Sequence, residues 1–537
     1  MHQATSALAP GAAHSSRPAF SCSERRGVLL PTVFSIIKNK RAAVNLRCRE
    51  ALIDRWTKKW NMKLLVILRV MRKNTSLRTV AIMLAYIFAS GCAVQGIPEA
   101  TAPPETATPQ PVLPSPVAPT PDNKPLEDLP TFIEAGMQVE FWHPWSGETA
   151  NLMAELSEQF NQENAWGIEV LSLPRGDERV MIQDIEAANA SDGMPDAAAL
   201  PVDYLPGLMR QGVLFQDLDT LIASEQWGLA EEQLESFFPV FMGAAVLENS
   251  RIGLPAYWSG YYLLYNQTWA GELGYTAQPA TIADFEAQVC AAALNNLYDG
   301  DLDTNGTGGY VYSQEGTAFF SWMRAFGGGN PIGQSGSWQL AQAGDAAAGE
   351  FLYDLYLKDC AWTGRQAQPY QYFSNRLALF YSGRLEDILI QGQVNQLEGS
   401  QDQWTLVPYP SMADKPVVFI EGSAYAILTP DGQRTLAAWE WIKWLLEPQN
   451  QARLVETSGS FPLSPSALEN LEEFRQEHPA WSQALQYLAL ADPVPLAPEW
   501  QMTKDVLSDF SWQLIRFTTS REDIPVLLMN AEGLFRE

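Results

Sequence analysis

Apolar and polar residues alternate along the chain in two periods from residue 139 onward, one typical of strands and the other of helices. Residues 139–142 (VEFW) predict a short strand. Leu152, Leu156 and Phe160 then fall at positions i, i+4 and i+8, on one face of a helix. Ser146 is the predicted N-cap of that helix, because its side-chain oxygen can accept a hydrogen bond from the first turn. The alternation continues with a strand, a helix and a strand over residues 167–173, 179–190 and 196–201.

This order of strands and helices predicts an α/β fold with a mainly parallel sheet, because strands that alternate with helices are usually joined by crossovers. Ligands of such sheets bind at the loops that leave the carboxyl ends of the strands. The loop over residues 143–147 (HPWSG) leaves the first strand. Its aromatic side chains are therefore expected where an α/β protein binds its ligand.

The length and charge of the chain narrow its class. At 537 residues it exceeds the size of one ordinary core and predicts at least two lobes. Residues 1–92 contain 16 Lys and Arg against 3 Asp and Glu, so the other 19 basic and 59 acidic residues give the remainder a net charge of −40 within the total of −27. Such an acidic body disfavours nucleic acid and anionic membranes as partners, and it fits the binding of neutral or cationic solutes.

The N-terminal region is typical of a targeting sequence. Residues 71–92 combine basic residues, an apolar run over 80–88 that is too short for an ordinary spanning helix, and small residues before Cys92. This pattern predicts a lipoprotein signal peptide in which Cys92 is lipidated; an uncleaved anchor helix is the alternative. We interpret residues 1–70 as an upstream extension or an artefact, with Met71 as the start.

Residues 93–130 are rich in Pro and Thr and predict an extended tether, since Pro fixes φ and lacks an amide hydrogen. Signal, cysteine and tether together predict an extracytoplasmic protein that is attached to the cell membrane through its lipid alone. Beyond the tether, Cys290 and Cys360 form an even pair in an oxidising compartment. The sequence leaves open whether they form a disulfide or stay as two buried thiols.

Five stretches, in order along the chain, resemble family 1 extracellular solute-binding proteins, the capture components of ABC importers for sugars and related solutes. The likeness begins with FWHPWSGETANLMAELSEQFNQ and covers essentially all of the body. The other four stretches are IGLPAYWSGYYLLYNQTWAGELGY, FSNRLALFYSGRLEDI, WTLVPYPSMADKPVVFIEGSAYAIL and AAWEWIKWLLEPQNQARLVETSGSFPLSPSAL.

The resemblance implies a periplasmic-binding-protein-like fold of type II, in which two α/β lobes are joined by a hinge and have a ligand cleft between them. The first lobe would comprise residues 138–255 and 409–457, and the second residues 259–405 and 461–537. A solute that touches both lobes would favour the closed form, which the permease subunits of the importer would recognise. No cofactor is implied, and a monomer is expected. The three crossings between the lobes would lie near 255–259, 406–409 and 458–462.

A sugar site needs flat aromatic surfaces beside amide, carboxylate or Arg partners, because sugars present apolar C–H faces and rims of hydroxyl groups. The first candidates are Trp142, His143, Trp145 and Ser146; Trp145 is expected to be exposed, whereas Trp142 can equally point into the core. Further candidates lie at predicted strand ends, crossings and turns. They are Asp203, Tyr204, Tyr257, Trp258, Trp322, Arg324, Trp362, Glu421, Gly422 and Trp500.

Several of these residues have a structural alternative. Asp203 can equally cap a helix, and Trp322 can pack in the core. Tyr257 and Trp258 flank the first crossing, where strand alternation turns only some side chains inward. Glu421 stands where the family often has glycine, so it is expected to hydrogen-bond hydroxyl groups or to select a cationic group.

Residues 299–310 (DGDLDTNGTGGY) partly match a calcium loop, with Asp301, Asp303 and Asn305 at three ligand positions. Tyr312 stands where the loop requires a bidentate Glu. We therefore predict a polar turn and no metal, with calcium as the alternative.

Other functions stay open beside carbohydrate capture. Glycerol phosphate and polyamine binders share related architectures, and a secreted glycan-active enzyme with paired carboxylates is a rival class. The sequence contains no G-x-S-x-G or H-E-x-x-H motif, and only His143 and His478 follow Met71. Hydrolytic metal or serine-triad chemistry is thus disfavoured. An adhesion or scaffold protein would be expected to contain repeats, and none is found. The prediction is a carbohydrate-binding protein and not an enzyme.

Overall fold

The computed structural model describes residues 129–191, 193–329, 339–366, 368–412 and 416–535. Contacts divide the chain into two units, Met1–Val112 and Leu113–Glu537, and all described residues belong to the second. The predicted signal peptide, Cys92 and nearly all of the predicted tether lie outside the described residues. Within these ranges, no helix is both long and apolar enough to cross a membrane.

Strands alternate with helices through the described unit, and most of the strands belong to one mixed sheet. The strands are β1 (Gln138–His143), β2 (Glu169–Pro174), β3 (Ala197–Pro201), β4 (Val246–Leu247), β5 (Ser250–Arg251), β6 (Leu254–Asn266), β7 (Gly308–Val311), β8 (Ala361–Trp362), β9 (Ala378–Arg384), β10 (Trp404–Val407), β11 (Val418–Ile427) and β12 (Ala491–Pro493).

The sheet has two parallel outer parts and an antiparallel middle. Its strand order is β2-β1-β3-β11-β6-β9-β7-β8, with β10 paired to β6 and β12 paired to β11. In the first part β1 pairs in parallel with β2 and β3, and in the second part β7 pairs in parallel with β8 and β9. Between them, β6 is antiparallel to β9, β11 is antiparallel to β3, and β6 and β11 are antiparallel to each other. The predicted α/β class is confirmed.

The first part of the sheet forms where the sequence predicts it. Leu152, Leu156 and Phe160 are buried on one face of the helix after β1, and Phe160 packs against Trp441 with ring centroids 5.3 Å apart. Ser146 is the N-cap of that helix, but its side chain accepts no hydrogen bond there. The helices of this part are α3 (Gly147–Glu163), α4 (Glu178–Asn189), η1 (Val202–Tyr204), α5 (Leu205–Arg210), α6 (Leu218–Ile222), α7 (Glu231–Ser236), α8 (Pro239–Met242), α15 (Gly432–Leu445) and α16 (Pro448–Ser458).

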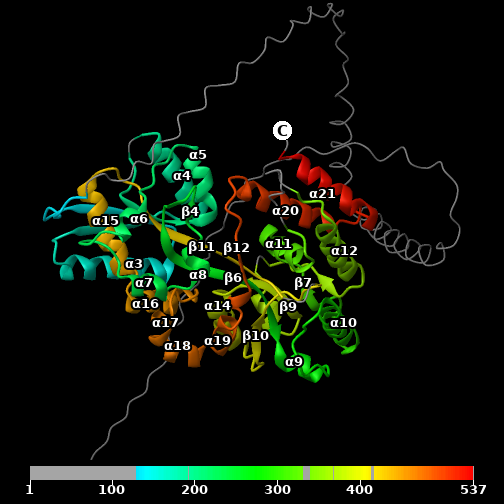
Figure 1. Ribbon diagram of the computed structural model, residues 1–537. Coiled ribbons are helices and arrows are strands. Elements are labelled where there is room, and N and C mark those ends of the chain that lie inside the picture. The colour runs from blue at the N-terminus through cyan, green and yellow to red at the C-terminus, as the bar shows by residue number, and fades with distance from the viewer. Residues whose placement is uncertain (1–128, 192, 330–338, 367, 413–415, 536–537) are drawn as a thin grey trace, which may run out of the picture. The chain divides into compact units, whose positions relative to one another are not determined.

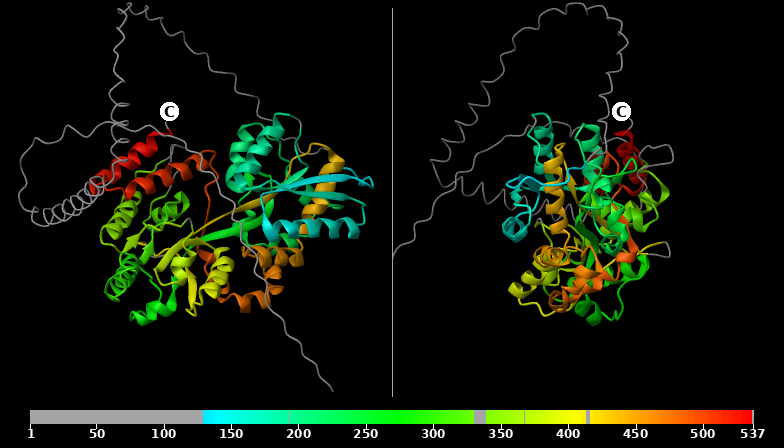
Figure 2. Two further views of the ribbon diagram at one scale, coloured as in Figure 1. Left: turned by 180° about the vertical axis from the view of Figure 1, so that it is seen from behind. Right: turned by 60° about the vertical axis from the view of Figure 1, so that its left-hand side comes forward.

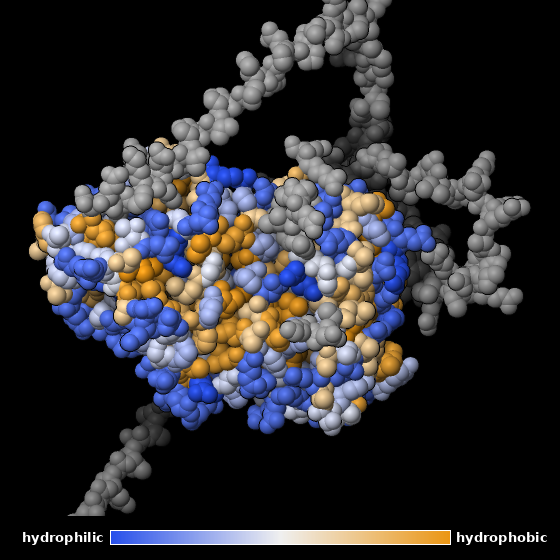
Figure 3. Space-filling view, viewed as in Figure 1, coloured by the Kyte–Doolittle hydropathy of each residue, from blue (hydrophilic) through white to orange (hydrophobic). Residues whose placement is uncertain are grey.

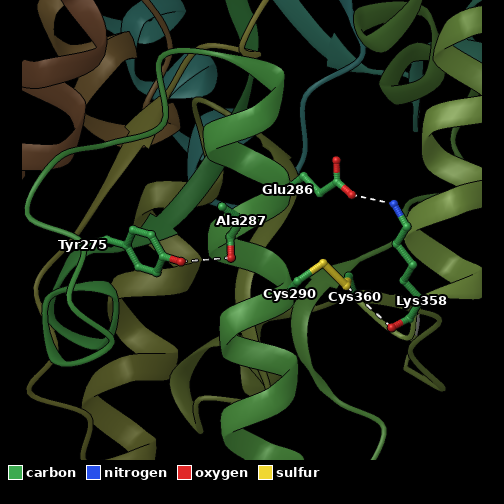
Figure 4. The surroundings of a disulfide bond; sticks show 6 residues. All are labelled: Tyr275, Glu286, Ala287, Cys290, Lys358 and Cys360. Carbon is green, nitrogen blue, oxygen red and sulfur yellow. Dashed lines mark hydrogen bonds and ion pairs between the residues drawn. A yellow bond between two sulfur atoms is a disulfide. The ribbon is translucent and has the colours of Figure 1, made fainter.

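The second part of the sheet is packed with longer helices and carries a disulfide between Cys290 and Cys360, whose Cα atoms are 4.5 Å apart (Figure 4). The bond ties the middle of one helix to the residue that precedes β8. The helices of this part are α9 (Gln267–Glu272), α10 (Ile282–Tyr298), α11 (Gly316–Ala325), α12 (Ala343–Leu357), α13 (Tyr370–Ser374), α14 (Asp387–Glu398), α20 (Trp500–Leu514), η3 (Arg521–Asp523) and α21 (Ile524–Gly533).

The two long middle strands link the parts. β6 and β11 run from the helices around β1–β3 to the helices around β7–β9 (Figure 1), and the view from behind shows the same course (Figure 2). All but one residue of β6, Tyr257, are buried, which agrees with its nearly uncharged, aromatic-rich sequence. The remaining helices follow α16 and precede β12, and one of them, α19, packs against β10. They are α17 (Pro465–Glu469), α18 (Glu472–Glu477), α19 (Pro479–Leu485) and η2 (Leu488–Leu490).

Candidate functional site

One face of the paired strands β6 and β11 carries a cluster of polar side chains, which we call the central cluster (Tyr257, Ser259, Tyr261, Arg384, Glu386 and Glu421). Tyr257, Ser259 and Tyr261 share a face of β6 because side chains alternate along a strand, and Glu421 of β11 lies opposite Ser259. The Tyr261 hydroxyl donates a hydrogen bond to Glu421 Oε1 at 3.1 Å. The Ser259 hydroxyl donates one to Glu386 Oε2.

Arg384 supplies the positive charge of the central cluster. Its Nη2 atom lies 2.5 Å from Glu421 Oε1 and its Nη1 atom 3.6 Å from Glu386 Oε1. Burial alone would raise the pKa of Glu421, but the Arg384 and Lys504 cations and the hydrogen bonds from Tyr261 and Arg384 together outweigh burial and hold that pKa below its usual value. Burial outweighs Arg384 at Glu386 and raises the pKa of that carboxyl. Two carboxylates therefore share one guanidinium, which also lies 4.9 Å from the centre of the Tyr261 ring.

A second set of charged contacts joins α20 to η1. Lys504 Nζ lies 2.8 Å from Asp203 Oδ2, and Gln501 Nε2 donates a hydrogen bond to the same oxygen at 2.5 Å. Burial would lower the pKa of Lys504, but the carboxylates of Asp203 and Glu421 outweigh it and raise that pKa. Since Glu421 belongs to the central cluster, the two sets of charges act on each other.

The charges of both sets act on Glu178. It is the first residue of α4, just beyond the carboxyl end of β2, and its side chain is exposed to solvent. Desolvation by the surrounding protein, with the carboxylates of Glu421 and Asp203, raises the pKa of Glu178 to about 7, although Arg384 and Lys504 oppose the shift.

A pocket of about 410 Å³ lies beyond the carboxyl ends of β7, β8 and β9. Its volume falls in the range of small-molecule sites, and its walls are mostly polar and uncharged side chains together with tyrosines. Around the sheet as a whole, hydrophobic surface gathers across the middle of the face seen in Figure 3, over β6, β11 and β12. The pocket is lined among others by Tyr312, Gln314, Glu315, Gln366, Tyr372 and Ser382.

The first loop is more buried than the sequence predicts. Trp145 is only 9% exposed, which corrects the expectation of an exposed ring; it stacks on His143 at 5.3 Å and lies 6.3 Å from the Tyr257 ring of the central cluster. His143 is fully buried, and this burial lowers its pKa to about 4. Trp142 is buried, in agreement with the alternative that it points into the core. The guanidinium carbon of Arg175 lies 3.9 Å from the centre of its ring. Ser146 is exposed.

Four predicted site residues come together. Tyr257 and Glu421 belong to the central cluster, and Asp203 contacts α20 through Lys504. The Lys504 ammonium also lies 5.9 Å from the centre of the Tyr204 ring. All four interact electrostatically with one residue that the sequence did not single out, Glu178.

Three predicted tryptophans lie in the core instead. Trp258 points to the opposite face of β6 from Tyr257, where its ring lies 5.1 Å from that of Phe241. Trp322 of α11 donates a hydrogen bond to the Tyr310 hydroxyl, and Trp500 packs between aromatic side chains of α11 and β11. None of the three is more than 1% exposed, so they have no surface for a solute.

The remaining candidates have local structural roles. Arg324 forms an ion pair with Asp492 at 2.5 Å. Trp362 ends β8 and packs edge-on against Tyr372, a wall of the pocket, with ring centroids 4.9 Å apart. A Cβ atom on Gly422 would lie 2.3 Å from the carbonyl oxygen of Tyr257, so this glycine allows β11 to approach β6.

The aspartate-rich turn after α10 does not gather its carboxylates. Asp299 and Asp301 accept hydrogen bonds from the backbone N–H groups of Asp301 and Asp303, respectively, as in a polar turn. Asn305 is the third residue of the proposed calcium set. Across the part of the chain that the structure describes, no three His, Cys, Asp or Glu side chains are grouped as metal ligands.

Sequence reasoning missed Glu178, Glu386 and Lys504. Glu178 had a usable signal, because it follows a predicted strand at its carboxyl end, where α/β sheets bind ligands. Lys504 had none: it lies on a helix and meets Asp203 across 301 positions of sequence.

Comparison with known proteins places these features in a family and a fold. A family model described as "Bacterial extracellular solute-binding protein" matches residues 155–502. No curated protein sequence matches the chain significantly.

Three solved structures share the architecture. The cyclic α-maltosyl-1,6-maltose binding protein from Arthrobacter globiformis has a TM-score of 0.61 at 16% identity, with 74% of this chain and 98% of that chain covered. The sugar-binding protein MalE from Xanthomonas citri has a TM-score of 0.60 at 20% identity, with 74% and 98% covered. UgpB from Mycobacterium tuberculosis, solved with glycerophosphocholine, has a TM-score of 0.61 at 16% identity, with 74% and 97% covered. The fold is therefore periplasmic-binding-protein-like.

Proposed function

The chain belongs to the family of bacterial extracellular solute-binding proteins, and on that premise we propose that it captures a carbohydrate for an ABC importer. Two of the three similar structures are named for sugar ligands. The single observation that carries the proposal is the central cluster beside a polar pocket. Tyrosine rings can stack on the C–H faces of a sugar, while carboxylate, guanidinium and amide groups bind its hydroxyl rim.

Capture of the solute by closure of two lobes fits a sheet with two outer parts that are joined by long middle strands. We assign the first lobe to residues 138–255 and 409–457 and the second to 259–405 and 461–537, as the sequence predicts, with β6 as one crossing. Asp203 and Lys504 then come from different lobes, and so do Arg210 and Glu499, which form an ion pair at 3.1 Å. A solute that binds both lobes adds to these contacts and shifts the population toward the closed form.

The setting of the protein follows the targeting sequence. We assign residues 71–92 as a lipoprotein signal peptide, Cys92 as the lipidated residue and 93–130 as the tether. The protein then acts outside the cytoplasm as a monomer held to the membrane by lipid, and it delivers its solute to permease subunits. Binding, without turnover of the solute, is the activity that we propose.

A glycerol phosphodiester is a second candidate, because UgpB was solved with glycerophosphocholine. The charges of the site argue against it. Arg384 is paired with Glu421 and Glu386, and Lys504 is paired with Asp203, so neither cation is available for a phosphate without losing a carboxylate partner. A neutral carbohydrate can bind without an unpaired cation.

The proposal is tested by isothermal titration calorimetry of the full chain with monosaccharides, α- and β-linked oligosaccharides, polyols, glycerol phosphodiesters and polyamines. We expect saccharide binding, weakened at least about tenfold, or about 1.4 kcal/mol, in Tyr257→Ala. Tyr298→Ala, which removes a tyrosine that is 79% exposed on α10, is the control and should bind normally. Binding of a phosphodiester or polyamine in place of every saccharide would contradict the proposal.

A further inference from the structure

A second pocket, which we call the aromatic pocket, lies among the helices around the first part of the sheet. Its volume is about 340 Å³. The helix α3 begins just after the carboxyl end of β1 and ends at Glu163, beside the pocket. The pocket therefore lies toward the amino ends of β1 and β2, at the opposite end of these strands from the loop over residues 143–147. It is lined among others by Phe160, Trp166, Gln233, Glu440, Trp444 and Glu447.

Three aromatic side chains give this pocket flat apolar walls. Trp166 is 38% exposed, although its ring packs against the buried Trp227 with ring centroids 5.1 Å apart. Phe160 and Trp444 form a second pair, with ring centroids 5.8 Å apart. Aromatic surface that stays open in a concave position is typical of a binding site.

The N-terminal segment of the described chain enters the fold beside this pocket. Trp227 Nε1 donates a hydrogen bond to the carbonyl oxygen of Pro130 at 2.9 Å, and Gln226 Nε2 donates one to that of Thr131 at 2.8 Å. Trp227 is the residue against which Trp166 packs. The residues that precede Pro130 are thus covalently held next to the aromatic pocket.

Those preceding residues have the composition of a ligand for an aromatic groove. Residues 113–125 (LPSPVAPTPDNKP), which we call the proline segment, contain 5 prolines and lie outside the described residues. Pro-rich sequences favour the polyproline II conformation, which is formed in advance and loses little entropy on binding. Grooves lined by aromatic side chains bind such segments through the proline rings.

Charge fits the same occupant. Lys124 is the only basic residue of the sequence between positions 93 and 130. Two carboxylates line the pocket, and Glu440 is already paired with Lys443 at 2.7 Å. Glu447 forms no ion pair with any other residue that the structure describes. A lysine on the incoming segment would supply that partner, and such a pair at the surface adds modestly to binding.

The proline segment is long enough to reach the pocket. Pro121 and Pro130 are nine positions apart in the sequence, and nine residues of polyproline II span about 28 Å. Only the Trp227 ring separates Pro130 from Trp166. A connection this short gives the segment an effective concentration on the order of millimolar at the pocket, so even weak docking would keep the pocket occupied.

We propose that the proline segment docks in the aromatic pocket of its own chain, with its proline rings against Trp166 and Trp444 and Lys124 beside Glu447. Docking would shorten the free part of the tether. It would also fix the end of the sheet from which the tether leaves, while the carboxyl ends of β1, β2 and β3 stay uncovered. This inference is independent of the identity of the solute.

The test measures the solvent access of Trp166 in the full chain by hydroxyl-radical footprinting with mass spectrometry. A variant with Pro114→Gly, Pro116→Gly, Pro119→Gly and Pro121→Gly loses the proline rings outside the described fold. We expect Trp166 to be oxidised at least threefold faster in this variant than in the wild type. Trp512, which is 48% exposed on α20, is the internal control and should be oxidised at the same rate in both.

A peptide and a protease identify the occupant from two sides. A synthetic peptide of residues 113–125, added at millimolar concentration to the glycine variant, should slow the oxidation of Trp166, and the same peptide with the four glycines should not. Thermolysin should cleave within residues 113–125 faster in Trp166→Ala than in the wild type. Trp512→Ala is the matched control and should leave the cleavage rate unchanged.

The results that would overturn the inference are equally specific. Equal oxidation of Trp166 in the wild type and the glycine variant would exclude docking of the proline segment. Protection of Trp166 in the glycine variant by a saccharide, with no effect of the peptide, would instead identify the aromatic pocket as a second sugar site. Neither result bears on solute capture at the central cluster, which is tested separately.

Discussion

Removing the disulfide between Cys290 and Cys360 should destabilise the protein by a calculable amount. The bond closes a loop over a sequence separation of 70 residues. In the chain-entropy account, a loop of that size restricts the unfolded chain enough to contribute about 4 kcal/mol. The nearby ion pair between Lys358 and Glu286, at 2.6 Å, is largely exposed and adds little. We therefore expect the double variant Cys290→Ser, Cys360→Ser to lose about 4 kcal/mol of unfolding free energy.

Urea unfolding followed by tryptophan fluorescence measures this loss. Wild-type protein treated with a reductant should unfold at the same urea concentration as the double variant, and the reductant should have no effect on the variant. Because Cys360 directly precedes β8, which borders the pocket, the variant should also bind its solute more weakly. Identical unfolding curves for oxidised wild type and variant would refute the loop-closure reasoning.

Three other perturbations test the site. Burial keeps His143 neutral, with a pKa near 4 in the folded protein against 6.5 when unfolded. The unfolding free energy should therefore fall by up to about 3 kcal/mol as pH drops from 6.5 to 4. His143→Phe should remove this dependence, as measured by urea unfolding at a series of pH values. Lys504→Met should cost about 3 kcal/mol by leaving Asp203 buried without its cation, and adding Asp203→Asn should restore part of the loss in a double-mutant cycle; strict additivity would contradict the pairing. Gly422→Ala should lower thermal stability by about 1–3 kcal/mol through the clash with the Tyr257 carbonyl, whereas Gly392→Ala, in open space on α14, should not.

The fold was accessible to sequence reasoning where the signal is local. The helical period of Leu152, Leu156 and Phe160 and the alternation of short strands with helices predicted the first part of the sheet, and the structure confirms both. Strand alternation also predicted that the side chains of Tyr257 and Trp258 would point to opposite faces of their strand. It could not show which of them faces the charged groups, because that depends on the strands and helices packed against β6.

The charge arrangement was inaccessible for a different reason. Arg384 meets Glu421 from a neighbouring part of the sheet, and Lys504 reaches Asp203 from a helix near the end of the chain. Such pairs depend on tertiary packing and leave no periodic trace in the sequence. The two core tryptophans on α11 and α20, Trp322 and Trp500, resemble site residues by type and are distinguished only by their burial.

Hydrogen exchange of the full chain, with and without the saccharide that binds most tightly, tests whether that saccharide is bound between the central cluster and the pocket. We expect protection of backbone amides in β6 and β11, in residues 312–315 at the pocket, and in the first turns of α20. Protection confined to other surfaces, with these segments unchanged, would contradict it.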